Sequence, residues 1–326
     1  MSEPISQDEQ PTFQPHPLYK GEHQTDKKPI VVDNGSGTPE TIFPVRFHTD
    51  KPSDAEGKPR DQTIEAAAHM RYAATLPIPH LEKRQLPRKG TAIIVGGAPS
   101  IKKYLEEIRK LSQDKNNEIF AINWTHTWLI QNGIVPNNTV FFEIDAEPDT
   151  VLKQAHKDCT YYICCHCHPK TFDDLAEFKR VIWHTPPNSQ IEREAADELW
   201  PNNEWQVGGG ISTFTRTITV ALYRGFRDFE LFGCDSSYPM NSQSHVEGYE
   251  TVMKDENDGL DMFAKDERTG EIRKFRTLGY LALQVEEFKL YCQANHGIFT
   301  LRVNGDEDSL LKYVHSTMFA DQYEYL

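Results

Sequence analysis

The stretch from Gly90 to Lys103 has the sequence GTAIIVGGAPSIKK. Its apolar, β-branched run Thr91–Val95 predicts a short buried strand, and the apolar residues that recur at helical spacing after Ser100 predict a helix. A strand, a glycine turn and a helix start together form a common phosphate site, because the first helical amides are unpaired and the helix dipole favours an anion. Ser100 would cap the helix or donate its hydroxyl to a phosphate oxygen. The alternative is an ordinary turn, since GGAPS matches neither the G-x-G-x-x-G fingerprint nor a Walker loop.

The composition limits the class of protein. The chain has 326 residues, of which 38% are hydrophobic, so it can form one large α/β domain or two small ones. Its formal net charge is −14 and it has no lysine- or arginine-rich run, which argues against a groove for duplex nucleic acid but not against a nucleotide. It has no apolar run of about 18 residues and no signal peptide, and its six cysteines form no disulfide framework. We therefore expect no membrane contact and a cytoplasmic protein.

The pattern of the chain divides it into three parts. Residues 1–60 are polar and predict a flexible tail, and residues 61–89 predict a helix (Thr63–Thr75) with a proline-rich lead-in. Residues 90–326 alternate between strands and helices, with a polar excursion at about 236–274 that predicts a lid or small insertion. This alternation predicts a Rossmann-like α/β domain whose mainly parallel sheet has helices on both faces. The predicted elements include a strand Thr139–Ile144, a helix from about residue 149 to 156, and a last strand Ile298–Val303 that closes the fold.

Polar residues follow the predicted strands, and ligands of such sheets bind beyond the carboxyl ends of the strands. The candidates at these ends, besides Gly96 to Ser100, are Asn123, Asp145, His166, His168, Asp235 and Ser236. Asp145 and Asp235 would lie at adjacent strand ends and together hold one Mg²⁺, which prefers oxygen ligands and bridges phosphate oxygens. The alternative is that each aspartate caps a turn or pairs with a neighbour.

Two further segments are candidates for the same crevice. Gly208, Gly209 and Gly210 come before Ser212 and a helix, which predicts a second anion site or a close approach to a base or sugar, unless the glycines serve packing. His245, in NSQSHVEGY, is a candidate acid/base or phosphate contact, with an idle loop histidine as the alternative.

The cluster Cys164-Cys165-His166-Cys167-His168 does not have the spacing of a zinc site. Alternate residues of an extended chain point to opposite faces, so the five side chains cannot converge on one ion. We expect His166 and His168 to line the mouth of the crevice, and Cys164 and Cys165 to be core residues.

The order of several motifs resembles a known family. They are GGAPSI after the first strand, AIN, GIVPNNTVFFEID, the second glycine turn, ALYRGFRDFELFGCDSSY and SHVEG. This order resembles the MptE-like domain of archaeal 6-hydroxymethylpterin diphosphokinase and its bacterial and phage relatives, which include motility accessory factors linked to flagellin glycosylation. It is more distantly similar to the Campylobacter-type sialyltransferases. The resemblance covers about residues 90–303.

The resemblance implies a Rossmann-like domain that binds a nucleotide or nucleotide sugar at the strand ends, in the cytoplasm of a bacterium or a phage-infected cell. The positions that match the family are Gly96, Gly97, Pro99, Ser100, Asn123, Asp145, Gly210, Ser212, Asp235 and His245. The chain departs from the pattern at Ala98 and Asn137, where relatives have glycine and aspartate. It also has Arg276 and Thr277 where the sialyltransferases have their general-base histidine, which weakens the glycosyl-transfer interpretation. The match of HVEG after the GCD strand end favours the diphosphokinase branch instead.

These observations lead to one main functional hypothesis and two alternatives. In the main one, Mg²⁺ on Asp145 and Asp235 bridges ATP phosphates held by the two glycine turns, and a hydroxyl-bearing acceptor attacks the β-phosphorus with help from His245. The first alternative is a glycosyltransferase that uses a nucleotide sugar in the same crevice. The second is a non-catalytic protein that keeps the fold for assembly or partner binding.

Overall fold

The computed structural model describes residues 30–33, 39–42, 61–145, 154–202, 206–210, 212–239, 245–246, 260–266 and 268–320. The chain divides into two units, residues 1–60 and 61–326. In the first unit, β1 (Ile30–Asp33) pairs antiparallel with β2 (Pro39–Ile42). The remainder of the predicted tail lies outside the described residues.

The second unit is built on a sheet of seven parallel strands in the order β11-β8-β3-β4-β5-β6-β7. The strands are β3 (Thr91–Val95), β4 (Glu118–Ile122), β5 (Asn138–Phe141), β6 (Thr160–Cys164), β7 (Lys179–Trp183), β8 (Asp228–Phe232) and β11 (Thr300–Val303). The central strands β3 to β6 are short, mostly apolar runs that are buried on both faces, as is typical of parallel strands. The prediction of a Rossmann-like α/β fold is confirmed.

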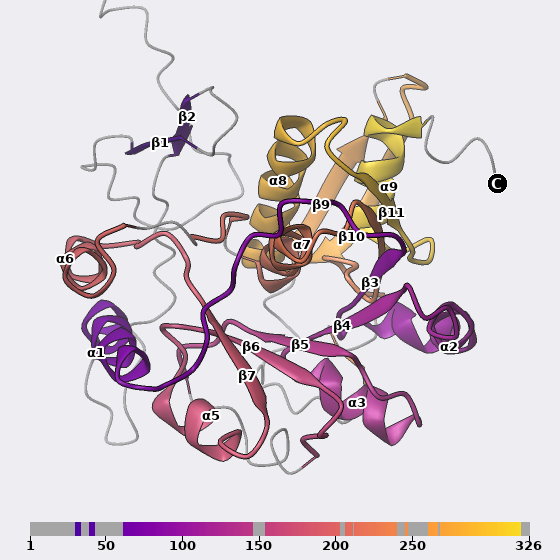
Figure 1. Cartoon of the computed structure of the whole chain (residues 1–326). Coiled ribbons are helices and arrows are strands. Elements are labelled where there is room, and N and C mark those ends of the chain that lie inside the picture. Colours follow the sequence, from indigo (N-terminus) through magenta and orange to yellow (C-terminus); the bar gives the residue numbers. More distant parts are fainter. Residues whose placement is uncertain are drawn as a thin grey trace, which may run out of the picture. The chain divides into compact units, whose positions relative to one another are not determined.

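Helices cover both faces of this sheet. They are α1 (Gln62–Ala74), the 3₁₀ helix η2 (Pro99–Tyr104), α2 (Leu105–Leu111), α3 (Thr125–Gln131), α5 (Pro169–Asp174), α6 (Gln190–Leu199), α7 (Thr213–Tyr223), α8 (Gly279–Ala294) and α9 (Leu310–Met318). Neighbouring residues of β3 point to opposite faces: Ile93 packs in the core with α2 and α3, and Ile94 in the larger core with α7. Figure 1 shows α2 and α3 on the side of the sheet opposite α7. No helix of the described residues is both long enough and apolar enough to span a bilayer.

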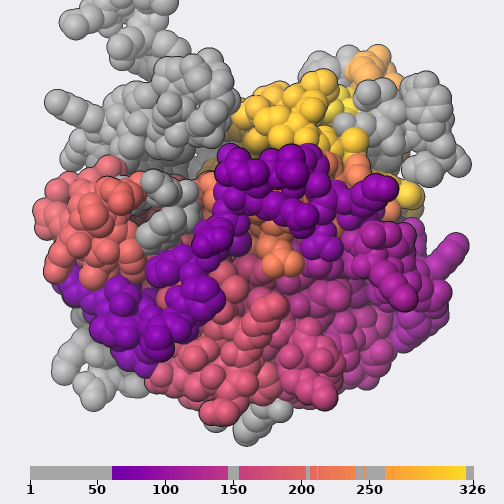
Figure 2. Space-filling view, viewed as in Figure 1, coloured from indigo at the N-terminus to yellow at the C-terminus, as the bar shows by residue number. Residues whose placement is uncertain are grey.

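The lead-in, residues 76–89, connects α1 to the central strand β3. It first runs beside β7, where the amide of Leu81 donates to the carbonyl of Ile182 (2.7 Å) and the amide of Ile182 donates to Pro79 (2.9 Å). It then passes the end of α7, where the amide of Arg84 donates to the carbonyl of Tyr223 (2.7 Å). In Figure 2 this indigo segment crosses the face of the molecule. The lead-in is therefore an ordered part of the fold.

Three predicted elements differ from the structure. The predicted strand that was to end at Ile144 ends at Phe141, so Asp145 lies in a loop and not at a strand end. The helix predicted at 149–156 falls mostly outside the described residues, and 154–156 are not helical. The last strand does not close the fold, because α9 follows it with Ser309 as its N-cap.

The polar excursion contains a second, two-stranded sheet. Here β9 (Leu260–Lys265) pairs antiparallel with β10 (Ile272–Thr277), and α8 begins two residues after β10. Phe275 of β10 is buried and contacts Tyr313 of α9, with ring centroids 5.4 Å apart. The insertion is thus anchored on the main domain through α9.

Candidate functional site

The strand order places the candidate site at the ends of β3 and β8. After β3 the chain moves to β4 on one side, and after β8 it moves to β11 on the other side. The connections that leave these two neighbouring strands therefore diverge, which is the point where open α/β sheets bind their ligands. We call the two turns that meet there, Gly96–Ser100 and Gly233–Ser237, the β3–β8 junction.

The two turns of the junction are joined backbone to backbone. The amide of Gly96 donates to the carbonyl of Phe232 (2.8 Å), and the amide of Ala98 donates to that of Gly233 (2.9 Å). A Cβ on Gly96 would lie only 2.5 Å from the Gly233 oxygen, so glycine is needed here for close packing. These amides are used inside the fold, which does not fit the predicted phosphate cradle. Gly97 and Pro99 lie in the same turn, and the Gly97 carbonyl accepts from the amide of Val246 (2.9 Å).

Ser100 and Asp235 contact each other at the centre of the junction. The Ser100 hydroxyl donates to Oδ1 of Asp235 at 2.9 Å, and both residues are buried. Burial raises the pKa of Asp235 from 3.8 to about 6. Ser100 does not cap the helix as predicted, because η2 begins one residue earlier with Ala98 as its N-cap. Strongly shifted carboxylates are common at functional sites, so Asp235 remains the leading catalytic candidate.

The residues after Asp235 tie the junction to two other elements. Ser236 has a left-handed backbone (φ 56°), and its hydroxyl accepts from Nε2 of Gln284 on α8 (2.7 Å). Ser237 donates to the carbonyl of Asp308 (2.5 Å), in the loop between β11 and α9. Ser236 is buried, so it holds α8 in place and does not line an open surface as predicted.

His245 directly precedes a residue that contacts the first glycine turn. This residue, Val246, is buried, and its amide donates to the carbonyl of Gly97 in the junction. Burial lowers the pKa of the half-buried His245 to about 4, and the ring is therefore neutral at pH 7.

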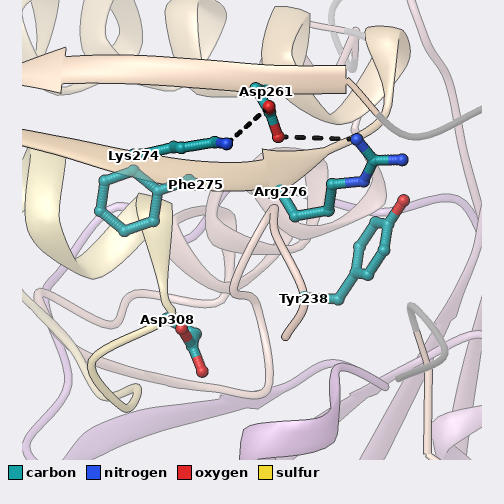
Figure 3. Close-up of a pocket in the computed structure, with 6 residues that line it drawn as sticks. All are labelled: Tyr238, Asp261, Lys274, Phe275, Arg276 and Asp308. Carbon is teal, nitrogen blue, oxygen red and sulfur yellow. Dashed lines mark ion pairs between the residues drawn. The ribbon is translucent and has the colours of Figure 1, made fainter. Parts of the chain in front are cut away.

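A pocket of about 130 Å³ lies beside the junction, between the β9–β10 hairpin and the loop before α9. It is lined by Tyr238, Asp261, Lys274, Phe275, Arg276 and Asp308. Figure 3 shows Lys274 and Arg276 directed at Asp261, at N–O distances of 2.7 and 3.5 Å. The amide of Tyr238, three residues after Asp235, donates to the Arg276 carbonyl (3.0 Å). The pocket thus offers two aromatic rings, two carboxylates and two cations.

The ends of β4, β5 and β6 form a second group of contacts. Asn123, with φ of 45°, donates through Nδ2 to Glu143 (2.7 Å), and its Oδ1 accepts from the amide of Phe142 (3.3 Å). His166 is buried against Phe142, with ring centroids 4.8 Å apart. This buried position beside Phe142 does not fit the predicted role of His166 at the mouth of the crevice.

His168 faces α1 and not the crevice. Its Nδ1 accepts from the amide of Lys170 (3.1 Å) as the N-cap of α5, and its ring contacts His69 at 5.2 Å. The predicted lining role therefore does not fit this residue. Cys164 and Cys165 are fully buried core residues, as predicted.

The second glycine turn leads into α7. Gly209 (φ 126°) and Gly210 (φ 74°) both have backbone conformations that favour glycine. Ser212 is the N-cap of α7, and its hydroxyl oxygen accepts from the amide of Thr215 at 3.3 Å. A side-chain carboxylate, that of Glu287 on α8, packs directly against Gly210.

Helix α8 links the β3–β8 junction to the second glycine turn. Gln284 contacts Ser236 of the junction, and Glu287 contacts Gly210 of the second turn. Residues three apart in a helix are neighbours on one face, so both contacts lie along one side of α8. The junction and the second glycine turn therefore belong to one continuous region.

The predicted magnesium pair does not fit this arrangement. Strands β5 and β8 are separated by β3 and β4, so their ends are about 14 Å apart at the usual strand spacing. A single Mg²⁺ needs its ligands about 2 Å away. Asp145 is exposed beyond β5, whereas Asp235 is buried against Ser100, and the described residues contain no group of three or more metal-ligating side chains.

Sequence reasoning missed Arg216, a buried arginine of α7 beneath the second glycine turn. A sequence signal was present: Arg216 is the single charged residue in Ser212–Tyr223, STFTRTITVALY. An otherwise uncharged helix is typical of a buried one, so a lone charge within it needs a reason.

The fold and the site together define a Rossmann-like α/β protein whose candidate site lies at the carboxyl edge of its sheet. The family model described as 6-hydroxymethylpterin diphosphokinase MptE-like matches residues 66–241, which is more than half of the chain. The chain therefore belongs to the MptE-like family, and the family predicted from the sequence is confirmed.

Solved structures give a further comparison. The MAf glycosyltransferase from Magnetospirillum magneticum AMB-1 matches with a TM-score of 0.56 and 17% identity, over 77% of this chain. The match spans 38% of the length of that protein, and at this identity it shows the fold alone. A mammalian sialyltransferase matches over 80% of this chain and 82% of its own at 11% identity, with a TM-score of 0.38 that carries no argument. No curated protein matches the chain.

Proposed function

We propose that the chain is a transferase whose nucleotide-bearing donor binds across the carboxyl ends of β3 to β6. The observation that carries the proposal is the β3–β8 junction at the switch point of the sheet, where a buried carboxyl has a raised pKa and a pocket lies beside it. Membership of the MptE-like family supports the same class of activity.

The chain's own residues supply positioning and one proton acceptor. Asp235 holds Ser100 and is hydrogen-bonded to Ser309, so it fixes the turns on both sides of the crevice. The neutral His245 ring can accept the proton of an acceptor hydroxyl, as a weak base with a pKa of about 4.

The first candidate reaction is pyrophosphoryl transfer from ATP to a hydroxyl. Mg²⁺, when bound to the nucleotide, would neutralise charge on the phosphates, and we assign it no aspartate pair on the protein. Incubation with ATP, Mg²⁺ and hydroxymethyl-dihydropterin should release AMP together with a diphosphorylated pterin. Release of orthophosphate, or no turnover, would contradict this reaction. His245→Gln should lower the rate without lowering nucleotide affinity.

The second candidate reaction is glycosyl transfer, and the pocket beside the junction favours it. The rings of Tyr238 and Phe275 can contact the apolar face of a sugar, while the Asp261 and Asp308 carboxylates can accept its hydroxyl protons. A thermal-shift comparison distinguishes the two reactions. Stabilisation by CMP- or UDP-sugars but not by ATP, lost in Tyr238→Ala, would select glycosyl transfer. Absence of any nucleotide binding would refute both reactions and favour a non-catalytic role.

A further inference from the structure

A buried arginine lies at the N-terminal end of α7. Arg216 is 5% exposed, and its Nη1 donates to the carbonyl oxygen of Val207, which precedes the second glycine turn. Its side chain therefore runs back toward the start of the helix, as long helical side chains do. The guanidinium carbon lies 5.3 Å from the centre of the Phe142 ring. Gly208, next to Val207, is exposed, so the guanidinium lies close beneath the surface of the turn.

Arg216 has no carboxylate partner among the described residues. Its Nε is buried and has no hydrogen-bond partner, and no carboxylate of the described residues lies within ion-pair distance of it. Burial lowers the pKa of the guanidinium to about 10, so it remains charged at pH 7. Burying a charge is costly unless it is paired and hydrogen-bonded, so a bound anion beside Arg216 would offset this cost.

Two neighbouring features also favour an anion at this place. Helix α7, which has 11 residues, begins three residues after Gly210, so the positive end of its dipole lies close to the turn along the chain. The Glu287 carboxylate already packs against Gly210, which shows that an anionic group fits against the turn. The field of Glu287 also acts on Arg216.

We propose that Arg216 and the turn Gly208–Gly210 form a binding site for a diphosphate group. The Nε edge of the guanidinium donates to its oxygens, and the group displaces the Glu287 carboxylate from the turn. Arginine suits this role because its planar fork can bind two oxygens at once. The assignment of this diphosphate group to the nucleotide donor rests on the proposed function, but the presence of a diphosphate site does not rest on it.

The test uses pyrophosphate as the probe, with binding to the full chain measured by calorimetry. Arg216→Met should weaken pyrophosphate binding by at least about tenfold, the loss expected for a charge-assisted hydrogen bond. Arg216→Lys should give an intermediate loss, because it keeps the charge without the fork. Glu287→Gln should tighten binding, because it removes the competing carboxylate. Arg224→Met is the matched control: Arg224 is at the other end of α7 and pairs with Glu118 at 3.6 Å.

Each outcome has a defined meaning. Equal pyrophosphate affinity in wild type and Arg216→Met, or no binding to wild type, overturns the site. If circular dichroism shows that Arg216→Met is unfolded, Arg216→Lys and Glu287→Gln decide, and unchanged affinity in both overturns it. Pyrophosphate binding that depends on Arg216, in a protein with no transferase activity, would refute the proposed function and leave the site standing. Transferase activity together with pyrophosphate binding that is independent of Arg216 would overturn the site and leave the proposed function standing.

Discussion

Replacement of Asp235 by asparagine tests whether the buried carboxyl of the junction carries the pKa that its surroundings impose. Asp235 is 4% exposed, and its Oδ1 accepts from the Ser100 hydroxyl at 2.9 Å. Burial is the largest influence and raises the pKa from 3.8 to about 6, although the bond from Ser100 acts in the opposite direction. Asparagine keeps an oxygen that can accept this bond but has no proton to lose.

The sign and size of the effect follow from the raised pKa. The folded state binds the proton more tightly than the unfolded state, so the contribution to stability is complete below about pH 4 and is lost as the pH rises through about 6. One pKa unit corresponds to about 1.4 kcal/mol, so ionisation of Asp235 lowers the free energy of unfolding by about 3 kcal/mol. Asp235→Asn should therefore gain about 3 kcal/mol relative to wild type between pH 4 and pH 7.

Urea unfolding at a series of pH values between 4 and 7 measures this difference directly. The difference between variant and wild type isolates Asp235 from other titrating groups. Asp261→Asn is the control, because the hydrogen bond from Lys274 holds the pKa of Asp261 below its ordinary value. Its carboxyl is therefore ionised in both states above about pH 4, and the difference between Asp261→Asn and wild type should stay constant across the series. A difference between Asp235→Asn and wild type that does not change with pH would refute the reasoning.

Three further predictions concern stability. Gly96→Ala should lower the free energy of unfolding by about 1–3 kcal/mol and weaken nucleotide binding, because its Cβ would lie 2.5 Å from the Gly233 oxygen. The control Gly133→Ala (φ 72°, open space) should show only the left-handed backbone cost of about 1–2 kcal/mol and keep nucleotide binding. Loss of nucleotide binding in both variants would contradict a specific role for the junction. Ser309→Ala removes the N-cap of α9 and should cost about 1 kcal/mol by urea unfolding, with no change as the contrary result. Burial lowers the pKa of His315 to about 4, so its contribution is lost as the pH falls from 6.5 toward 4, and His315→Asn should flatten this acid limb of the stability profile.

The sequence predicted the sheet well because each strand is a short β-branched or aromatic run between polar turns. Strand order was harder to predict, since it depends on which strands pair in space. The error at Asp145 arose in this way: VFFEI continues as an apolar pattern, but the strand ends at Phe141, and β5 is not adjacent to β8. The helix α9 was missed although Ser309 supplies a clear N-cap.

The candidate site was only partly accessible to the same reasoning. The junction was predicted as a set of strand ends, but the sequence does not reveal that the amide of Gly96 is used by Phe232 across the sheet. His166 was expected in the crevice because it follows a predicted strand, whereas it is buried against Phe142. Arg216 was missed because the spacing of apolar residues in α7 predicts a buried face but does not show that the one charge of the helix is buried as well.

The lead-in has a consequence for how the protein behaves at high concentration. β7 is an edge strand, and an uncovered edge is a template for pairing with another molecule. The lead-in occupies part of this edge through Leu81 and Ile182, and places Pro79, which has no amide hydrogen to offer, beside it. A shortened chain that began at β3 would therefore expose the unpaired backbone groups of β7 to pairing with another molecule. We expect such a chain to self-associate, which light scattering would detect.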